Sequence, residues 1–145
     1  MSELQGLYQQ VILDHAREKH GYGLRKDAAA SSHQYNPTCG DEVTVGVHAA
    51  AGRIQSISWE GHGCSISTAS ASLLNDLAQD VDPAELQGAL AAFRELMQSK
   101  GTLDGDEDVL GDAVALAGAS KYVMRVKCAM LPWVALEDAL LKAGL

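Results

Sequence analysis

The sequence lacks any hydrophobic run long enough to cross a membrane. Apolar residues make up 47% of the chain, yet no stretch approaches the roughly 20 consecutive apolar residues of a membrane-spanning helix. The first residues include Glu3, Asp14 and Arg17, and no apolar segment followed by a small-residue cleavage site marks a signal peptide. We therefore expect a cytoplasmic protein that does not enter a membrane.

Basic residues are scarce as well. The chain has 11 Lys and Arg against 19 Asp and Glu, which gives a formal net charge of −8. Nucleic-acid-binding proteins need the opposite balance, because neutralisation of phosphates supplies most of their affinity. The composition therefore argues against a nucleic-acid partner and favours protein partners or small ligands.

Cysteine is limited to three residues, and this odd number does not suit a disulfide framework. Cys39, Cys64 and Cys128 also lie too far apart for the closely spaced Cys-x-x-Cys pairs of a zinc ribbon. Reduced thiols in a reducing compartment are the better interpretation. Whether they are buried filler or ligands depends on their surroundings.

The length of 145 residues predicts a single domain over residues 1–145. Alternating Val43, Val45 and Val47 predict a strand, and a hairpin loop at Ala49–Arg53 leads to a second strand at Ile54–Glu60. A short edge strand is expected around Ser32–Tyr35.

Helical periodicity and capping signals predict the helices. Ser2 and Gln5 read as a capping box of a first helix that ends near Gly21 or Gly23. Further helices are expected from Ser65, from the Asp82-Pro83 start signal, over Asp112–Gly118 and over Ala129–Ala143. The last one should begin close to Cys128 or kink there, because proline at position 132 is tolerated only in a first helical turn.

Each cysteine lies in a segment that suits a metal ligand. Asn36-Pro37-Thr38-Cys39-Gly40-Asp41 is a tight turn that offers a thiol and a carboxylate two residues apart. In Gly61-His62-Gly63-Cys64 the glycines leave room around the sulfur, and the following helix start favours a thiolate. In Arg125-Val126-Lys127-Cys128 two cations should lower the pKa of the thiol, again where a loop enters a helix. Taken singly, each cysteine has an alternative interpretation as an incidental or buried thiol.

Together the three sulfurs and the Asp41 carboxylate supply four ligands, the number that zinc prefers. The segments NPTCGD, GHGCSISTASAS and RVKCAMLPW, with the opening LYQQVILDH, resemble the IscU/NifU-type iron–sulfur cluster assembly family, and most closely its SufU branch. The resemblance implies an α+β fold with a small antiparallel sheet of about three strands packed against about five or six helices.

The resemblance also implies a function and a set of site residues. Cys39, Asp41, Cys64 and Cys128 would bind zinc, Cys39 would accept persulfide sulfur, and Arg125 would be a supporting cation. The partners would be a SufS-type cysteine desulfurase and downstream SUF assembly proteins, which makes the protein a zinc-dependent sulfurtransferase.

Two other functions stay open. The same four ligands could hold iron or an iron–sulfur cluster in a scaffold protein, or zinc in a purely structural adaptor domain. Lys127 stands where scaffold-type relatives carry a histidine, and His62 stands where relatives often have an acidic residue. The segment Ala16–His20 also departs from the Asn-Pro turn that is common after the first helix.

Other motifs give weaker evidence of a function. The acidic run from Asp104 to Asp108 resembles a calcium loop, but Val109 and Ala115 occupy the positions that require glycine and glutamate. No Gly-x-Ser-x-Gly motif accompanies the serines after Cys64, which argues against a hydrolase. His62, two residues before Cys64, is a weaker candidate ligand.

Overall fold

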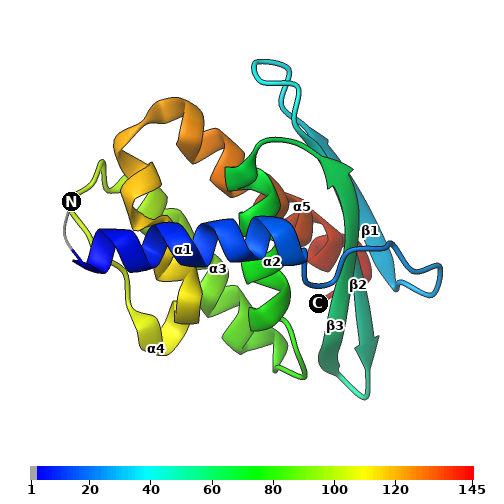
Figure 1. Cartoon of the computed structure of the whole chain (residues 1–145). Coiled ribbons are helices and arrows are strands. Elements are labelled where there is room, and N and C mark those ends of the chain that lie inside the picture. Colours follow the sequence, from blue (N-terminus) through cyan, green and yellow to red (C-terminus); the bar gives the residue numbers. More distant parts are fainter. Residues whose placement is uncertain (1–2) are drawn as a thin grey trace.

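The computed structural model describes residues 3–145 as a three-stranded antiparallel sheet with helices packed on one face (Figure 1). The strands follow one another in the order β1 (Ala30–Tyr35), β2 (Glu42–Ala50) and β3 (Arg53–His62). The helices are α1 (Glu3–Glu18), α2 (Ser65–Leu77), α3 (Pro83–Gln98), α4 (Glu107–Leu110), the 3₁₀ helix η1 (Gly111–Lys121) and α5 (Val123–Ala143). This arrangement confirms the predicted α+β class.

The helix-facing side of the sheet is apolar because every second residue is valine in the first part of β2, and Ile57 and Trp59 occupy alternate positions in β3. Val45 lies opposite Trp59 and Val47 lies opposite Ile57, and all four side chains are buried. Cross-strand pairs of β-branched and aromatic side chains stabilise a sheet directly. These residues supply the sheet's share of the core.

The opposite side of the sheet is crossed by residues 19–29, which join α1 to β1. The N–H of Gly23 donates to the carbonyl of Trp59, and the N–H of Ala29 donates to the carbonyl of Val47, both at 2.8 Å. A Cβ at Gly46 would lie 3.0 Å from the Cβ of Ala28. Glycine at position 46 therefore lets this segment lie close to the strand.

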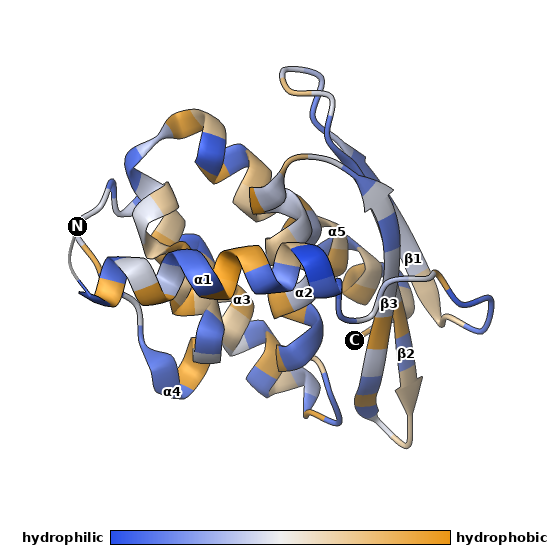
Figure 2. Ribbon diagram, viewed as in Figure 1, coloured by the Kyte–Doolittle hydropathy of each residue, from blue (hydrophilic) through white to orange (hydrophobic). Residues whose placement is uncertain are grey.

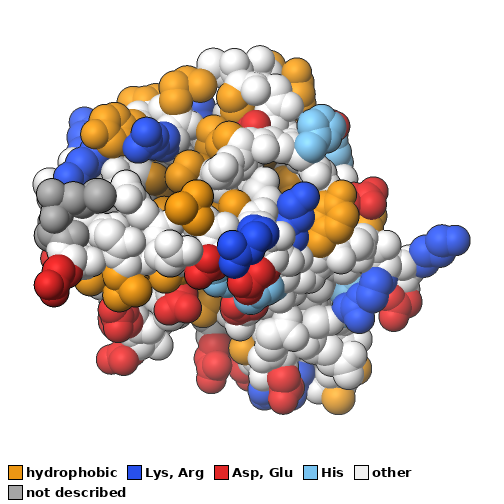
Figure 3. All heavy atoms as spheres, in the orientation of Figure 1, with side chains coloured by type: hydrophobic (Ala, Val, Ile, Leu, Met, Phe, Trp, Pro, Cys, Tyr) orange, Lys and Arg blue, Asp and Glu red, His pale blue; other side chains and the backbone are white. Residues whose placement is uncertain are grey.

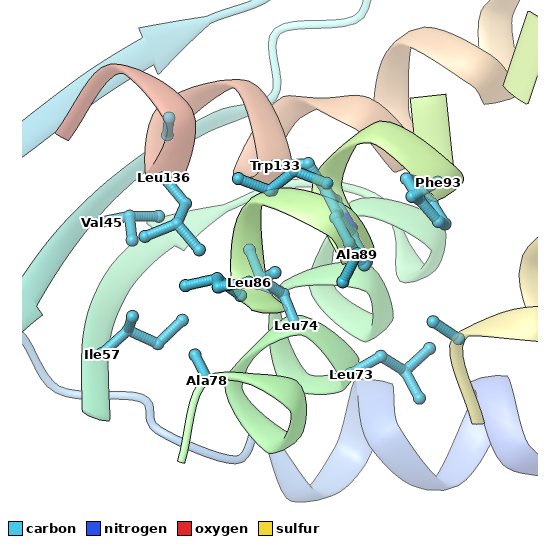
Figure 4. Packing of buried hydrophobic residues seen from close by; sticks show 14 of the residues in the cluster. Val45, Ile57, Leu73, Leu74, Ala78, Leu86, Ala89, Phe93, Trp133 and Leu136 are labelled. Carbon is cyan, nitrogen blue, oxygen red and sulfur yellow. The ribbon is translucent and has the colours of Figure 1, made fainter. Parts of the chain in front are cut away.

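The core lies between the sheet and the helices (Figure 4). Side chains of Val45 from β2, Leu74 from α2, Leu86 from α3 and Leu136 from α5 converge there, and each is almost fully buried. Burial of each such side chain stabilises the fold by about 1.5–3 kcal/mol. The core therefore joins the sheet to α2, α3 and α5.

The start of α5 differs from the prediction. The helix begins at Val123, so that Pro132 lies inside it and Cys128 lies in its second turn. Proline has no N–H to donate to the carbonyl four residues earlier. Packing of the next residue compensates: Trp133 stacks on Phe93 with ring centroids 3.9 Å apart, and its Nε1–H donates to the hydroxyl of Ser70 at 2.8 Å.

Other helix boundaries are close to expectation. Asp82 caps α3 by accepting the N–H of Ala84 at 2.8 Å, as its start signal predicts. The first helix ends at Glu18, before the predicted glycines, because Lys19 already adopts a positive φ of 50°. The capping box includes Ser2, which lies outside the described residues.

The surface mixes charge with scattered apolar side chains. Along α1 hydrophobic and hydrophilic stretches alternate (Figure 2), and acidic side chains gather along the lower edge of the face in Figure 3. Among residues 3–145, no helix is both long and apolar enough to span a bilayer.

Candidate metal centre

Three segments that are distant in the sequence meet at one end of the sheet. They are the loop between β1 and β2, the junction of β3 with α2, and the second turn of α5. One ligand atom from each of Cys39, Asp41 and Cys128 lies within 4.8 Å of the others. The structure thus brings together three of the four predicted ligands in one compact group.

The loop that carries Cys39 and Asp41 is closed at its base by hydrogen bonds of Asn36. The N–H of Asn36 donates to the carbonyl of Asp41 at 2.8 Å, and the N–H of Gly40 donates to the carbonyl of Asn36 at 2.8 Å. The side-chain oxygen of Asn36 accepts the N–H of Thr38 at 3.0 Å, as in an Asx turn. This closure leaves Cys39 exposed at the tip and buries Asp41 at the base.

Asp41 is a buried carboxylate that is only half satisfied. It is 4% exposed, and its Oδ1 accepts the N–H of Cys64 at 3.1 Å. Its Oδ2 is buried and has no hydrogen-bond partner among residues 3–145. Burial by itself raises the pKa of Asp41, but hydrogen bonding with Cys128, Cys64 and Ser67 outweighs it and lowers the pKa below the usual value. These neighbours favour the carboxylate form, and Oδ2 is the oxygen that makes no direct hydrogen bond.

Gly63 makes room for this carboxylate. A Cβ at position 63 would lie 2.7 Å from Cγ of Asp41 and 2.4 Å from Oγ of Ser67. The sequence predicted that the glycines beside Cys64 leave space around the sulfur. The space at Gly63 instead belongs to Asp41, and the composition of the motif alone gave no sign of that partner.

The sulfur atoms of Cys39 and Cys128 lie 3.8 Å apart. A disulfide requires about 2.05 Å, and all three cysteines are free. Two thiolates bound tetrahedrally to one zinc ion at about 2.3 Å each would lie about 3.8 Å apart. The spacing therefore matches a shared metal ion.

The pKa of Cys128 moves opposite to the prediction from Arg125 and Lys127. Burial, followed by hydrogen bonding with Cys64 and Asp41, raises the pKa of this thiol well above its usual value. The neighbouring residues Arg125 and Lys127 are both exposed, whereas Cys128 is buried. Burial therefore favours the protonated form of Cys128.

Arg125 lies apart from the compact group. Its guanidinium covers the ring of Tyr122 at 4.8 Å, and the residue lines a cavity between α1 and η1. The structure therefore gives Arg125 an aromatic partner on its own helix turn.

Cys64 adjoins the compact group without being part of it. It is the N-cap residue of α2, as predicted from the helix start, and its side chain is exposed. Its sulfur lies 3.8 Å from Oγ of Ser67, whose hydroxyl donates to the carbonyl of Cys64 at 3.1 Å. Its side chain also takes part in the hydrogen bonding that shifts the pKa values of Asp41 and Cys128, so its sulfur lies beside the group.

The donor set fits zinc. Thiolate and carboxylate ligands are both ordinary for this metal, and Oδ2 of Asp41 makes no hydrogen bond among the described residues that would compete with a cation. Within the part of the chain that the structure describes, no histidine joins the cysteine group. His62 has an exposed side chain, at 77%, and its Nε2 lies 3.4 Å from Glu42.

Comparison with known proteins gives a consistent family. Residues 7–129 match the model of the NifU-like N-terminal domain. The iron–sulfur cluster assembly scaffold protein IscU of Streptococcus pyogenes serotype M1 is 34% identical over 144 residues, which cover 99% of this chain and 89% of that protein. The zinc-dependent sulfurtransferase SufU of Bacillus subtilis is 36% identical over 142 residues, which cover 97% of this chain and 94% of that protein.

A solved structure extends the likeness to three dimensions. It is a crystal structure from Fervidobacterium islandicum, described as a candidate iron–sulfur cluster assembly scaffold protein for the SUF system. It superposes with a TM-score of 0.81 at 31% identity and covers 97% of this chain and 96% of its own. The sheet and its helical layer are therefore those of this group of proteins.

Proposed function

The chain belongs to the NifU-like N-terminal domain family, and from that premise we propose that it is a zinc-dependent persulfide acceptor in iron–sulfur cluster assembly. Its sulfur donor would be a cysteine desulfurase of the SufS type, and it would pass sulfur to downstream SUF assembly proteins. One observation carries the proposal: a buried Asp41, whose Oδ2 makes no hydrogen bond, lies beside two sulfurs that are 3.8 Å apart. The Bacillus subtilis relative, named a zinc-dependent sulfurtransferase, supports the same choice.

The proposed zinc ligands are Cys39, Asp41, Cys64 and Cys128. When bound, zinc supplies a redox-inert positive charge that keeps thiols deprotonated at neutral pH. Asp41 and Cys128 are buried and therefore hold fixed positions. Cys39 and Cys64 are exposed and complete the set from the solvent side.

Cys39 is the proposed sulfur acceptor because its backbone has more freedom than that of the other two cysteines. Cys64 is held at its N–H by Asp41 and at its carbonyl by the N–H of Thr68, at 3.1 Å each. Cys128 is buried in a helix. Cys39 lies at the exposed tip of a loop, where the neighbouring Gly40 adopts a φ of 77° and has open space around it.

The proposed step is thiol–persulfide exchange. The Cys39 thiolate attacks the outer sulfur of a cysteine persulfide on the desulfurase, and a new sulfur–sulfur bond forms at Cys39. The sulfur–sulfur bond of the desulfurase persulfide breaks, and its cysteine leaves as a thiolate that takes up the proton of the transferred sulfur. No external oxidant or reductant is needed, because the transferred sulfur keeps its oxidation state.

The supporting role of Arg125 stays a prediction. Its guanidinium lies over the ring of Tyr122. Arg125 itself lies about one helical turn before Cys128 in α5. A move away from that ring would be needed before it could meet an incoming anionic persulfide.

The Cys39→Ala variant tests the acceptor. With a matched SufS-type desulfurase and cysteine as substrate, we expect the variant to abolish stimulation of desulfuration. Mass spectrometry should find the persulfide on Cys39 of the unmodified protein. Full stimulation by the variant, with the persulfide on Cys128 instead, would show that the roles are assigned wrongly.

A cluster scaffold is the second candidate, because the Streptococcus pyogenes relative carries that name. Two exposed cysteines could also accept iron as cargo. Anaerobic reconstitution with ferrous iron, cysteine and desulfurase separates the two functions by Mössbauer and visible absorption spectra. A near-stoichiometric cluster that passes intact to an apo-acceptor would favour the scaffold, whereas the sulfurtransferase proposal expects none to accumulate.

A further inference from the structure

A second group of potential metal ligands lies at the other end of α2. His15 from α1, His20 from the following turn and Asp76 from α2 each offer one ligand atom, and these atoms lie within 4.8 Å of one another. Nδ1 of His20 lies 2.9 Å from Oδ1 of Asp76, and Nε2 of His15 lies 3.9 Å from Oδ2 of Asp76. Asp76 follows Cys64 by twelve positions, or about 18 Å along a helix, so this group is separate from the cysteines.

The imidazole of His15 is oriented by a buried hydroxyl. Its Nδ1 lies 2.7 Å from Oγ of Ser72, and both residues are buried. Metal-binding histidines are held in this way, with one ring nitrogen hydrogen-bonded and the other directed at the metal. The Nε2 of His15 is the nitrogen nearer Asp76, and it is therefore the one available as a ligand.

The backbone of His20 is fixed at both ends. Its N–H donates to the same Ser72 hydroxyl at 2.9 Å, and its carbonyl accepts Nε1–H of Trp59 at 2.7 Å. Ser72 therefore positions both histidines at once. The two ring centroids lie 4.7 Å apart, which keeps both imidazoles beside the same carboxylate.

The local electrostatics favour a cation. The C-terminal end of α1 at Glu18 and that of α2 at Leu77 both lie beside the group, and helix C-termini carry partial negative charge. The carboxylates of Asp76 and Glu18 lie 2.9 and 3.0 Å from the two ring nitrogens of His20. These carboxylates add negative charge beside the group.

We propose that His15, His20 and Asp76 form a second site for a divalent transition-metal ion, distinct from the cysteine centre. Two imidazole nitrogens and one carboxylate oxygen suit ions such as Fe²⁺, Co²⁺ and Zn²⁺ and do not suit Ca²⁺ or Mg²⁺, which prefer oxygen ligands. Three protein ligands on a partly exposed surface leave positions for water, so the ion binds more weakly than at a closed four-ligand site. Neither sulfur chemistry nor a desulfurase enters this proposal.

Cobalt titration of the zinc-loaded full-length chain, without a histidine tag, tests the second site. We expect one additional Co²⁺ per chain, with absorption typical of nitrogen and oxygen ligands and without thiolate charge transfer. In NMR spectra, the bound Co²⁺ should broaden the imidazole signals of His15 and His20 more than those of the other histidines. Thiolate charge transfer would instead report cobalt at the cysteines, so a failure of the zinc proposal can be recognised separately.

Matched variants decide whether these residues bind the ion. His20→Gln and Asp76→Asn should each weaken the second binding step by at least about tenfold, the range seen when groups that support a metal site are removed. His33→Gln is the control, because His33 also pairs with a carboxylate, Glu42 at 3.1 Å, elsewhere on the surface. The proposal is overturned if the zinc-loaded chain takes up no further ion, or if the control weakens binding as much as His20→Gln. Circular dichroism verifies that each variant is folded.

Discussion

The two ends of β2 each bury one ionisable side chain. Asp41 immediately precedes the strand and is 4% exposed, and His48 lies near its end and is 5% exposed. Among the described residues, Oδ2 of Asp41 and Nδ1 of His48 are buried and make no hydrogen bond, although Nδ1 of His48 lies 3.2 Å from Oδ1 of Asp27. By burial alone the two residues look alike.

The atoms that surround Asp41 and His48 are different. Cys39 and Cys128 surround Asp41 with atoms that are themselves metal ligands, whereas His48 lies beside the hydroxyl of Ser58 at 2.7 Å. The pKa is lowered at both positions, which keeps the aspartate charged and the histidine neutral. A buried atom without a partner therefore indicates a ligand site only where the surrounding atoms can also bind that ligand.

The largest expected effect comes from removal of the charge at Asp41. Asp41→Asn should lose zinc and, with it, the stabilisation that metal binding gives to the folded state. At zinc concentrations about 1,000-fold above Kd that stabilisation is about 4 kcal/mol. Metal analysis and thermal unfolding with and without chelator measure both effects.

Asp27→Asn is the matched control at the other end of the strand, since the Asp27 carboxylate is exposed and lies 3.2 Å from His48. It should keep its zinc and lose thermal stability on chelation as the unmodified protein does. Equal zinc loss in both variants would mean that the carboxylate at position 41 is not a ligand.

The position of Asp41 shows which features the sequence could predict. The thiol and carboxylate of the Cys39–Asp41 turn predicted a ligand pair, and alternating valines predicted β2 itself. The packing of Gly63 against the carboxylate could not be predicted, because it depends on how β3 meets α2 in space. Cys128 was wrongly placed at a helix entry, since the rule for proline ignores the packing that keeps Pro132 inside α5.

Two glycine substitutions test the contrast between the zinc site and the rest of the sheet, and we expect effects of intermediate size. Gly63→Ala places a methyl group against Asp41 and Ser67 and should weaken zinc binding at least about tenfold, as other disturbances around metal ligands do. Gly46→Ala places one against Ala28 and should cost about 1–3 kcal/mol of stability through overpacking, with zinc affinity unchanged. Competition with a chromophoric chelator measures affinity, and urea unfolding measures stability. The contrast would be contradicted if Gly46→Ala weakened zinc binding and Gly63→Ala lowered only the stability.

The smallest expected effect is a pH dependence at His48. Burial, ahead of the positive charge of Arg25, lowers the pKa of His48 below the usual value of 6.5, although Asp27 acts in the opposite direction. Above pH 6.5 both the folded and the unfolded chain carry a neutral imidazole, and the stabilising contribution is complete. As the pH falls from 6.5 toward the lowered pKa, only the unfolded chain binds the proton, so the free energy of unfolding decreases. One proton changes this free energy by at most about 1.4 kcal/mol per pH unit.

Urea unfolding of the chelated protein between pH 8 and 5.5 measures how the free energy of unfolding changes with pH. The slope of this dependence should be smaller for His48→Gln than for the unmodified protein. His33→Gln, at an exposed position, should leave the slope unchanged. The comparison uses slopes and not absolute stabilities, so it remains valid even if the loss of the bond to Ser58 weakens the variant at every pH. Parallel profiles for the unmodified protein and His48→Gln would show that His48 takes up its proton equally in both states, and that its burial has no electrostatic consequence.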